Sequence, residues 1–516
     1  MTSMDVRTVL RRSVWHNEHR VAIVEGEQRI TFGQAWDRAI RLANGLAAQG
    51  IKERDKVAVL ENNSIAAIDM YLGAAAANLC RVPLYLRNRV ESHVQMLTNT
   101  GARAVIVHAA HAHELDGVLE AVPTLEQVII HDDSYEAWLS EQSPIDPNPV
   151  VHPDDLFVIR HTGGTTGLPR AVAFTHERWW RGARDWFYLF PAPSAGDPIL
   201  HVGPISHASG YTLLPVWAAG GTQVIPNDTT PEHVVDVLER EGIAYAFVPP
   251  TLLSRLTRVP GVERREFSAL KVLFVGAAPI SEETIRRARA VFGDTRLWQL
   301  YGGTEACPTA GMGPREWFAD VSGSTPLRAA GRIFPWAELE IRDDGGNPIS
   351  EGGEGEIWVR SDTSATEFYN APEETTQRIR DGWISVGDIG RIDANGYLYL
   401  LDRKNDMIVS GGFNIYPGEI ENVIASHPEV LEVAVFGIPH AVWGETPMAV
   451  CNVAQHATVN ATDIKDLVAE RLGSYKKPSR VEFQSDPLPR SPVGKLMRRS
   501  LREPHWQGHD RRVAGT

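Results

Sequence analysis

Short apolar runs alternate with longer amphipathic segments through most of the chain. The short runs are rich in β-branched residues, and segments such as Phe32–Gln49 and Thr230–Glu241 repeat apolar residues at helical spacing. Alternation of this kind predicts a layered α/β fold with mainly parallel sheets. The runs that we expect to form buried strands are Lys56–Leu60, Ala104–Val107, Val128–His131, Gly221–Pro226, Ala244–Val248 and Lys271–Gly276.

The segment from Ser281 to Gly293 carries the signals of a complete helix. Ser281 suits the N-cap, because its hydroxyl can accept a hydrogen bond from a backbone N–H of the first turn. Glu282 and Glu283 favour the positive end of the helix dipole, and Gly293 suits the other end. We therefore expect a helix soon after the strand that ends at Gly276.

The pattern changes between Gly331 and Leu401, where short apolar runs and glycine turns follow one another closely. These runs predict a small β-rich subdomain, and a charged run at Asp402–Asp406 follows it. We expect a large N-terminal domain over residues 1–402, with two layered α/β sheets and this subdomain, and a small mobile α+β domain over residues 403–516. The expected strands and helices are Glu338–Arg342, Gly355–Val359, Arg391–Asp393, Tyr397–Leu401, Pro417–Ser426, Val430–Phe436, Asp463–Leu472 and Arg480–Phe483.

Composition narrows the class of protein without identifying it. The 65 acidic residues exceed the 51 basic ones, and the net charge of −14 argues against nucleic acid as a partner. Three scattered cysteines (Cys80, Cys307 and Cys451) form neither a disulfide framework nor a metal-binding pair, which fits a reducing compartment. The apolar stretch Ile65–Cys80 is interrupted by Asp69 and favours a buried helix over a membrane span. We expect a cytoplasmic monomer or homodimer without an integral membrane segment.

The strongest local signal is a glycine- and threonine-rich run from His161 to Arg170, between two predicted strands. Glycines let successive backbone N–H groups converge, threonine hydroxyls add donors and Arg170 adds a positive charge, which together suit a polyphosphate. A P-loop is excluded, because the Gly-Lys-Ser/Thr ending is absent and a strand follows. A plain hairpin turn is the alternative, although turns rarely need several threonines. The residues that we assign to phosphate binding are Thr162, Gly163, Gly164, Thr165, Thr166, Gly167 and Arg170.

This run resembles the phosphate-binding loop of the adenylate-forming superfamily of acyl- and aryl-CoA synthetases, luciferases and nonribosomal adenylation domains (the ANL superfamily). Further segments resemble the motifs of that family, in the same order, along nearly the whole chain. They are Gly203–Gly210, Gly276–Pro279, Gln299–Glu305, Trp383–Asp388, Leu401–Glu421 and Pro489–Lys495. The resemblance implies an AMP-forming acid ligase, which activates a small carboxylic acid with ATP and passes it to a second substrate.

The resemblance also implies which residues bind ATP and Mg²⁺. Tyr301 would offer a flat face to adenine, Asp388 would accept the ribose hydroxyls, and Thr304 would contact the α-phosphate. Glu305 and Thr165 are the implied ligands of Mg²⁺, which prefers oxygen donors. The implied ATP-binding residues outside the loop are Gly276, Ala277, Ala278, Gln299, Tyr301, Gly302, Asp388 and Arg403.

Lys495 is the implied catalytic lysine, together with Thr304, Glu305 and His207. Its ammonium would bridge the substrate carboxylate and the α-phosphate as charge develops between them. In the family the small domain then rotates about a hinge, which corresponds here to Asn405, and presents a second surface to the acyl group. The residues implied to meet CoA, the expected co-substrate, are Gly411, Gly412, Gly437 and Trp443.

Five positions depart from the family pattern, among them Ala171, which stands where glycine is usual. Gly163 and Val386 stand where a hydroxyl residue is usual, Arg170 stands where lysine is usual, and Asn405 stands where aspartate or lysine is common. Arginine keeps the charge of lysine but not its geometry. We expect these departures to tune ATP use and not to abolish it.

The implied acyl pocket is bordered by His201, His207, Gly276 and Gly302. A strand through this region would place His201 and His207 on one face, although a lone histidine such as His201 is more typical of a core. An aromatic stretch nearby either packs in the core or lines the pocket, and it favours an aryl, cinnamyl-like or medium acyl acid. Its residues are Trp179, Trp180, Trp186, Phe187 and Tyr188.

The acceptor of the acyl group stays open at this level. CoA is the commonest acceptor in the family. Related enzymes use an amine and form an amide, and diazotising ligases activate nitrite for an aryl amine. A nucleotide-binding protein without catalysis is a further class, but the presence of Glu305, Asp388, Arg403 and Lys495 together argues against it.

Overall fold

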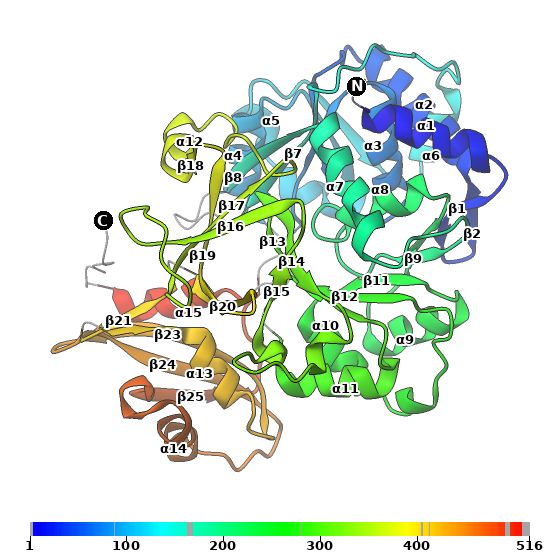
Figure 1. The fold of residues 1–516 in the computed structure, drawn as a ribbon. Helices are drawn as coiled ribbons and strands as arrows, with labels where there is room; N and C mark the ends of the chain where they lie inside the picture. The colour runs from blue at the N-terminus through cyan, green and yellow to red at the C-terminus, as the bar shows by residue number, and fades with distance from the viewer. Residues whose placement is uncertain are drawn as a thin grey trace.

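The computed structural model describes residues 4–86, 88–162, 169–278, 280–403, 406–411, 413–490 and 496–507. These residues form three sheets with helices packed around them, as the alternating pattern predicts (Figure 1). The third sheet, with the C-terminal helices, lies to one side of the rest of the molecule. None of the described helices is long and apolar enough to cross a membrane.

The first sheet has the strand order β6-β5-β3-β4-β7-β8, and its strands run parallel except for the antiparallel pair β7–β8. Helix α2 begins with a capping box, in which Thr31 and Gln34 each bond the other's backbone N–H. Helix α3 is buried along almost its whole length, as its apolar sequence predicts. The elements of this part are α1 (Val6–Asn17), α2 (Phe32–Ala48), β3 (Lys56–Leu60), α3 (Ile65–Ala76), β4 (Cys80–Pro83), α4 (Val90–Thr100), β5 (Ala104–His108), α5 (Val118–Ala121), β6 (Gln127–His131), α6 (Tyr135–Glu141), β7 (Leu156–Thr162) and β8 (Arg170–Thr175).

The second sheet has 14 strands. Its α/β half has the strand order β13-β12-β11-β9-β10-β1-β2. Strands β14 and β15 connect this half by hydrogen bonds to the β-rich strands. Ser281 caps α11 by accepting a hydrogen bond from the Thr284 backbone N–H, and Gly293 ends the helix with a φ of +91°. The elements are β1 (Val21–Glu25), β2 (Gln28–Thr31), α7 (His176–Leu189), β9 (Pro198–Leu200), α8 (Gly210–Ala218), β10 (Thr222–Ile225), α9 (Pro231–Arg240), β11 (Tyr245–Val248), α10 (Pro250–Leu256), β12 (Val272–Gly276), α11 (Glu282–Phe292), β13 (Leu297–Gly303), β14 (Ala306–Met312), β15 (Gly331–Ile333), β16 (Ala337–Arg342), β17 (Gly355–Ser361), α12 (Pro372–Arg378), β18 (Ile379–Arg380), β19 (Trp383–Ile392) and β20 (Tyr397–Arg403).

The third sheet has five strands, with β24 hydrogen-bonded to β21, β23 and β25. Helices α13 and α14 pack against it and share a separate core of isoleucine and valine side chains. Its elements are β21 (Ile408–Ser410), β22 (Phe413–Ile415), α13 (Pro417–Ile424), β23 (Val430–His440), β24 (Gly444–Val453), α14 (Ala461–Leu472), β25 (Arg480–Gln484) and α15 (Arg498–Arg502).

Two predictions about strands need correction. The strand expected at Arg391–Asp393 is only the end of β19, which is ten residues long and carries Asp388. A strand at 444–453 was not predicted, although β24 is the centre of the third sheet. Both errors have one cause: glycine and proline inside these strands break the apolar pattern.

Candidate active site

The carboxyl ends of β12 and β13 form the centre of the candidate site. Gly276 ends β12 and lies opposite Leu300 of the parallel strand β13. A Cβ atom at Gly276 would lie 2.4 Å from the Leu300 carbonyl oxygen, and one at Gly302 would lie 2.7 Å from the carbonyl oxygen of Ala306. Only glycine permits two backbones to approach this closely, so the sequence keeps this edge free of side chains.

Small exposed residues border the same edge. Ala277 has a φ of +67°, in the left-handed region that favours a sharp turn, and both Ala277 and Ala278 are exposed. The Gln299 side chain is buried, and its Oε1 atom has no hydrogen-bond partner among the described residues. Thr304 follows in the turn between β13 and β14 and is half-buried. This surface leaves room for a flat ligand beside β13.

Tyr301 connects this edge to the strand pair β19–β20. Its ring is buried, and its hydroxyl donates a hydrogen bond of 2.8 Å to Oδ2 of Asp388. Asp388 is the cross-strand partner of Arg403, whose Nε atom lies 3.6 Å from Asp388 Oδ1. Burial, and then the charge of Asp388, raises the pKa of Tyr301 well above its usual value, so the hydroxyl remains a donor. Asp388 Oδ1 keeps capacity to accept hydrogen bonds from a ligand.

A row of alternating charges links the predicted Mg²⁺ ligand to the predicted phosphate cation. Arg378 Nη2 lies 3.6 Å from Oε1 of Glu305, whose side chain is buried. The Oε1 atom of Glu374 lies 3.4 Å from Arg378 Nη1 and 3.2 Å from Arg170 Nη1. Burial lowers the pKa of Arg170, against the raising effect of Glu374. The donors fit a Mg²⁺–phosphate group, with carboxylate oxygens for the ion and guanidinium groups for the phosphate.

Arg378 and Glu374 were not predicted from the sequence. They belong to α12, a short helix whose exposed and half-buried residues include an i,i+4 acid–base pair. Such pairs are common on helix surfaces, and so the spacing alone does not indicate a site. Only the packing of α12 beside β19 brings the pair to Glu305.

His207 lies in an irregular segment that is fixed to the first sheet. Asn63 donates a hydrogen bond of 2.7 Å to the Gly203 carbonyl oxygen and accepts one of 2.8 Å from the Ile205 backbone N–H. The His207 ring meets the Tyr85 ring edge-on, with centroids 5.7 Å apart. Asn63 was not predicted as a site residue, and it sets the path of the segment that carries His207.

His201 has a structural environment that differs from the one expected. The strand predicted to carry both histidines ends at Leu200, so no strand places His201 and His207 on one face. His201 is fully buried, and its two ring nitrogens are hydrogen-bonded to Ser209 Oγ (2.7 Å) and Gln223 Oε1 (2.8 Å). Burial lowers the pKa of His201 to about 4. No ring nitrogen of His201 is left for a substrate.

The aromatic stretch on α7 divides between a cavity, the core and the surface. Trp179 stacks on Tyr211 with centroids 5.3 Å apart, and both rings line a cavity between α7 and β14 that also reaches Cys307. Trp186 lines the same cavity and packs edge-on against the buried ring of Phe274. Tyr188, in contrast, is 73% exposed and lines no wall. The aromatic interpretation therefore applies to part of the stretch.

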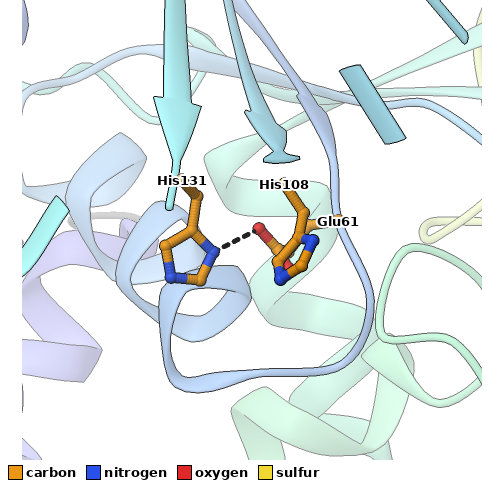
Figure 2. A group of neighbouring side chains, drawn as sticks. All are labelled: Glu61, His108 and His131. Carbon is orange, nitrogen blue, oxygen red and sulfur yellow. Dashed lines mark hydrogen bonds and ion pairs between the residues drawn. The ribbon is translucent and has the colours of Figure 1, made fainter. Parts of the chain in front are cut away.

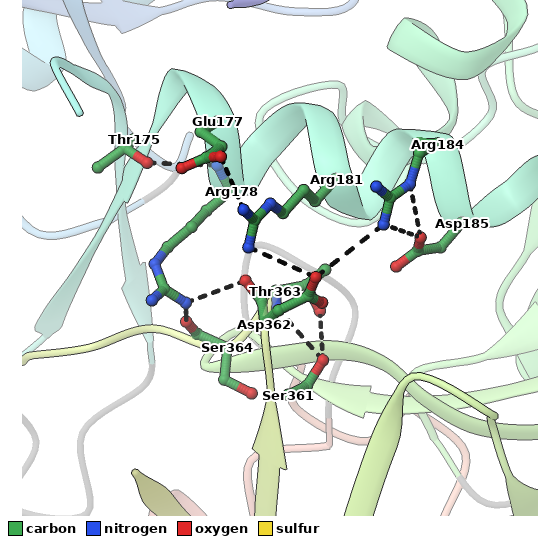
Figure 3. A network of polar contacts seen from close by, with 10 residues as sticks. All are labelled: Thr175, Glu177, Arg178, Arg181, Arg184, Asp185, Ser361, Asp362, Thr363 and Ser364. Atoms are coloured by element: carbon green, nitrogen blue, oxygen red, sulfur yellow. Dashed lines mark hydrogen bonds and ion pairs between the residues drawn. The ribbon is translucent and has the colours of Figure 1, made fainter. Parts of the chain in front are cut away.

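Polar contacts join helix α7 to the turn after β17 (Figure 3). Arg178 of α7 donates hydrogen bonds to the carbonyl oxygens of Asp362 (3.0 Å) and Ser364 (2.7 Å). The next residue, Ala365, donates its backbone N–H to the carbonyl oxygen of Glu305 at 2.8 Å. The turn after β17 thus connects helix α7 directly to the β13–β14 turn.

The predicted CoA-binding residues lie on the third sheet and its loops. Gly411 has a φ of +58°, and its N–H donates to the Trp443 carbonyl oxygen at 2.9 Å. The Trp443 ring is 52% exposed and stacks on His440 with centroids 4.4 Å apart. A Cβ atom at Gly437 would lie 2.2 Å from Oε2 of Glu445, so a side chain would displace that carboxylate. Trp443 thus presents an aromatic face beside a glycine turn.

A buried acid lies at the start of the third-sheet region. Asp402 accepts hydrogen bonds from the backbone N–H groups of Gly418 (2.9 Å) and Arg403 (2.7 Å). The Nη1 atom of Arg498 lies 3.9 Å from Asp402 Oδ1. The Nε atom of the same arginine donates a hydrogen bond of 2.8 Å to Oε1 of Glu421. Burial raises the pKa of Asp402 to about 7, because this partly shared arginine compensates its charge only in part.

Several predicted site residues lie outside the described residues, and their roles stay predictions. For Thr162 the structure describes the backbone, at the end of β7, but not the side chain. The residues concerned are Gly163, Gly164, Thr165, Thr166, Gly167, Asn405, Gly412 and Lys495.

The fold and the site define a class of enzyme. A glycine-lined edge, a buried glutamate and a Tyr–Asp–Arg cluster lie together, as a site for a nucleotide and its phosphates requires. The model of the AMP-binding enzyme family matches residues 10–369, and that of the AMP-binding enzyme C-terminal domain matches residues 419–495. The chain therefore belongs to the AMP-binding enzymes of the ANL superfamily, and it is an AMP-forming acid ligase.

The names of similar proteins refer to different acceptors of the acyl group. The chain is 31% identical to a fatty acid–acyl-carrier-protein ligase of Streptomyces coeruleorubidus, over 98% of both chains. It is 33% identical to a long-chain-fatty-acid–CoA ligase of Mycobacterium tuberculosis, over 92% of this chain and 93% of that protein. The structure of an amide bond synthetase from Marinactinospora thermotolerans has a TM-score of 0.84 and 27% identity, over 96% of this chain and 99% of the other.

Proposed function

We propose that the enzyme adenylates an aryl, cinnamyl-like or medium acyl carboxylic acid with ATP and then transfers the acyl group to CoA. The Tyr301–Asp388–Arg403 cluster beside the glycine-lined edge of β12 and β13 is the observation that carries this proposal. It offers a hydrogen-bonded carboxylate next to a surface with room for a base, as a nucleoside requires. Membership of the AMP-binding family supports ATP as the nucleotide.

In the first step a carboxylate oxygen of the acid attacks the α-phosphorus of ATP, and the bond to pyrophosphate breaks. Bound Mg²⁺, held by Glu305 and Thr165, would neutralise phosphate charge. Arg170 would hold phosphate oxygens with the backbone N–H groups of the loop, and Thr304 would donate to the α-phosphate. Lys495 would place its ammonium between the two reacting groups, where negative charge concentrates.

The acid would enter between α7 and β14 from the side of His207. The cavity there has a volume of only about 20 Å³, about the room of one water molecule, so side chains such as Trp179 would have to move when the acid binds. The stacked pair of Trp179 and Tyr211 supports a planar or elongated apolar acid, because aromatic walls bury flat surfaces well. Cys307 lines this cavity and lies beside Gly302 of the glycine edge, so this side of the cavity would face the nucleotide.

In the second step the thiol of CoA attacks the acyl carbonyl carbon, and AMP leaves. We propose that residues 403–516 act as the mobile domain and turn about Asn405 between the two steps. Gly411 and Gly412 would then let the pantetheine arm pass close to the backbone, and Trp443 would offer its exposed ring to the nucleotide of CoA.

An acceptor other than CoA is the second candidate. The likeness to an amide bond synthetase, at 27% identity over nearly the whole chain, favours an amine as the alternative. Diazotisation, in which nitrite is the adenylated oxyacid and an aryl amine the acceptor, shares the adenylation step, and the experiment below tests it with the amines. The adenylating half is common to all of these reactions.

One experiment tests both halves of the proposal. The enzyme is incubated with ATP, Mg²⁺ and a panel of aryl, cinnamyl-like and aliphatic acids, and release of pyrophosphate is measured. CoA, a mixture of amines and nitrite are then offered together, and products are identified by mass spectrometry. We expect acyl-CoA with the preferred acid. Amide products would show that the acceptor is an amine and not CoA. If no acid leads to release of pyrophosphate, the proposed adenylation is wrong.

Trp443 gives a prediction specific to CoA. Trp443→Ala should raise KM for CoA about tenfold, the order of one aromatic stacking contact, and leave pyrophosphate release unchanged. Trp15→Ala is a matched control, since Trp15 is also exposed (79%) and lies beside a histidine ring, at 5.1 Å. If the two variants have equal KM values for CoA, Trp443 does not bind CoA.

A further inference from the structure

Three side chains of metal-ligating type lie together at the carboxyl edge of the first sheet, on strands that the proposed activity does not use. Their donor atoms all lie within 4.8 Å of one another. The residues are Glu61, His108 and His131, and Figure 2 shows them at the ends of neighbouring strands.

The strand register brings these three residues into one row. His108 and His131 are direct partners in the parallel pair β5–β6. Leu60 of β3 is the partner of Val107 of β5, so Glu61 comes next to His108 in the same row. The row is therefore fixed by three parallel strands and not by a loose surface loop. Carboxyl ends of parallel strands are where α/β sheets commonly bind ligands.

The donor atoms in this row are incompletely paired. Oε2 of Glu61 lies 2.8 Å from Nδ1 of His131, while Oε1 is buried and has no hydrogen-bond partner among the described residues. The Glu61 side chain is only 2% exposed, so its second oxygen cannot rely on bulk water. His108 uses Nδ1 to accept the Ala110 backbone N–H at 3.1 Å, which leaves Nε2 for another partner. Because buried polar atoms are normally paired, a buried carboxylate oxygen without a hydrogen-bond donor indicates a bound cation or a proton.

We propose that Glu61, His108 and His131 bind a Zn²⁺ ion. Two imidazoles and one carboxylate are a common Zn²⁺ ligand set, and water would fill the fourth position, since His131 is 20% exposed. Mg²⁺ is a poor candidate, because it prefers oxygen ligands throughout. Tetrahedral ligands of Zn²⁺ lie about 3.3 Å apart, so the three donor atoms, which lie within 4.8 Å of one another here, would have to move closer when the ion binds. The site is separate from Glu305 and does not rest on the proposed function.

The position of the site indicates what the ion does. It would join β3, β5 and β6 at their carboxyl ends, two residues before Asn63. Asn63 holds the backbone at Gly203 and Ile205, in the segment that leads to His207. The ion therefore stabilises this corner of the first sheet, and bound Zn²⁺ should raise the melting temperature.

Chelator competition with the full-length protein tests the proposal. Metal-free enzyme is titrated with Zn²⁺ in the presence of a chromophoric chelator, and Co²⁺ is added separately to record its visible absorption bands. We expect one equivalent of Zn²⁺ on the wild type, unaffected by excess Mg²⁺, and Co²⁺ bands of a site with imidazole ligands. Glu61→Gln and His108→Ala should each weaken Zn²⁺ binding at least about tenfold.

His113→Ala is the matched control, because His113 is an exposed histidine close in sequence but outside the row. It should bind Zn²⁺ like the wild type. Glu61→Gln keeps the shape of the side chain, so it still tests Zn²⁺ binding if the His108→Ala variant does not fold. The proposal is overturned if the wild type leaves all Zn²⁺ on the chelator, or if Glu61→Gln binds it as tightly as the wild type.

Discussion

At the scale of single residues, Tyr301 does two things with one side chain. Its ring forms part of the wall beside β13, and its hydroxyl fixes the Asp388 carboxylate by a hydrogen bond of 2.8 Å. A fixed carboxylate binds a diol better than a mobile one, because the ordering has already occurred before the ligand arrives. The orientation of Asp388 should therefore depend on the phenol.

Tyr301→Phe tests this dependence. The variant keeps the ring and removes the donor, and hydrogen bonds to charged groups contribute about 1.5–3 kcal/mol. We expect kcat/KM for ATP to fall about tenfold or more by the same principle, while KM for the acid changes little. Initial rates of pyrophosphate release over a range of ATP concentrations measure both.

Tyr399→Phe is the matched control for this variant. Tyr399 also donates a hydrogen bond from its hydroxyl to an aspartate, Asp393, at 2.8 Å. It belongs to β20, the strand paired with β19, which carries Asp388. It carries no predicted site role, so its loss should lower stability without raising KM for ATP. The same change in KM in both variants would mean that Tyr301 acts only through general stability.

Arg378 gives a second prediction at this scale. Arg378→Met leaves Glu305 and Glu374 without their shared cation, so both carboxylates repel each other and the bound phosphates. We expect kcat/KM for ATP to fall about tenfold and the Mg²⁺ concentration for half-maximal rate to change. Arg380→Met is the control, since Arg380 packs over the Trp358 ring at 5.8 Å outside the row. An unchanged Mg²⁺ dependence in Arg378→Met would contradict a role beside Glu305.

The residues also show where sequence reasoning ends. Glycines such as Gly276 and Gly302 were predictable, because the motif requires a close approach of two strands. Arg378 and Asn63 were not, because each reaches the site from a distant segment through its side chain. His201 was placed in the pocket on spacing alone, and its two hydrogen bonds in the core fix it elsewhere.

At the scale of elements, buried strands and amphipathic helices were predictable almost to their ends. Lys56–Leu60 coincides with β3, and the helix expected after Ser281 is α11. Among the strands that were not predicted, β14, β15 and β24 contain glycine or proline and are held by neighbouring strands more than by their own pattern. Pairing between strands that are distant in sequence cannot be deduced from periodicity, which explains why the continuous second sheet was not expected.

The segment between β20 and α13 contains an element-scale prediction about pH. Burial raises the pKa of Asp402 to about 7 from an ordinary value near 3.8. The folded state therefore binds more protons than the unfolded state between these pH values, and stability falls as pH rises from about 4 to about 7. Each unit of difference corresponds to about 1.4 kcal/mol, an upper bound for a site with relaxation.

Asp402→Asn should remove this dependence. The amide keeps an oxygen for the Gly418 N–H and carries no charge at any pH. We expect the melting temperature of Asp402→Asn, relative to the wild type, to increase between pH 5 and pH 8. Thermal unfolding in a series of buffers measures the difference, with Asp486→Asn, near the surface of the same region, as the control. A difference that is constant over the series would contradict the raised pKa.

At the scale of the whole molecule, the net charge of −14 opposes the proposed ligands, since ATP and CoA are both polyanions. Binding must rest on local cations and backbone N–H groups, because a cluster of donors outweighs a distributed charge at short range. Arg170 and Arg378 beside the β13–β14 turn form such a cluster. The acidic composition argues against nucleic acid as the main partner, but it does not indicate the charge of the proposed substrates.

Two chemical steps at one carbonyl group require the molecule to exchange catalytic groups, and Lys495 should belong to only one of the two arrangements. Lys495→Ala should lower pyrophosphate release about a hundredfold or more, the usual effect of losing one charge that stabilises the transition state. Transfer from a supplied acyl-adenylate to CoA should change only a few-fold, because in the proposed rotation the second step would use the other face of the small domain. Both half-reactions are measured separately, and Lys477→Ala, an exposed lysine of the same domain, is the control. Equal losses in both half-reactions would show that one fixed arrangement serves both steps and would contradict rotation about Asn405.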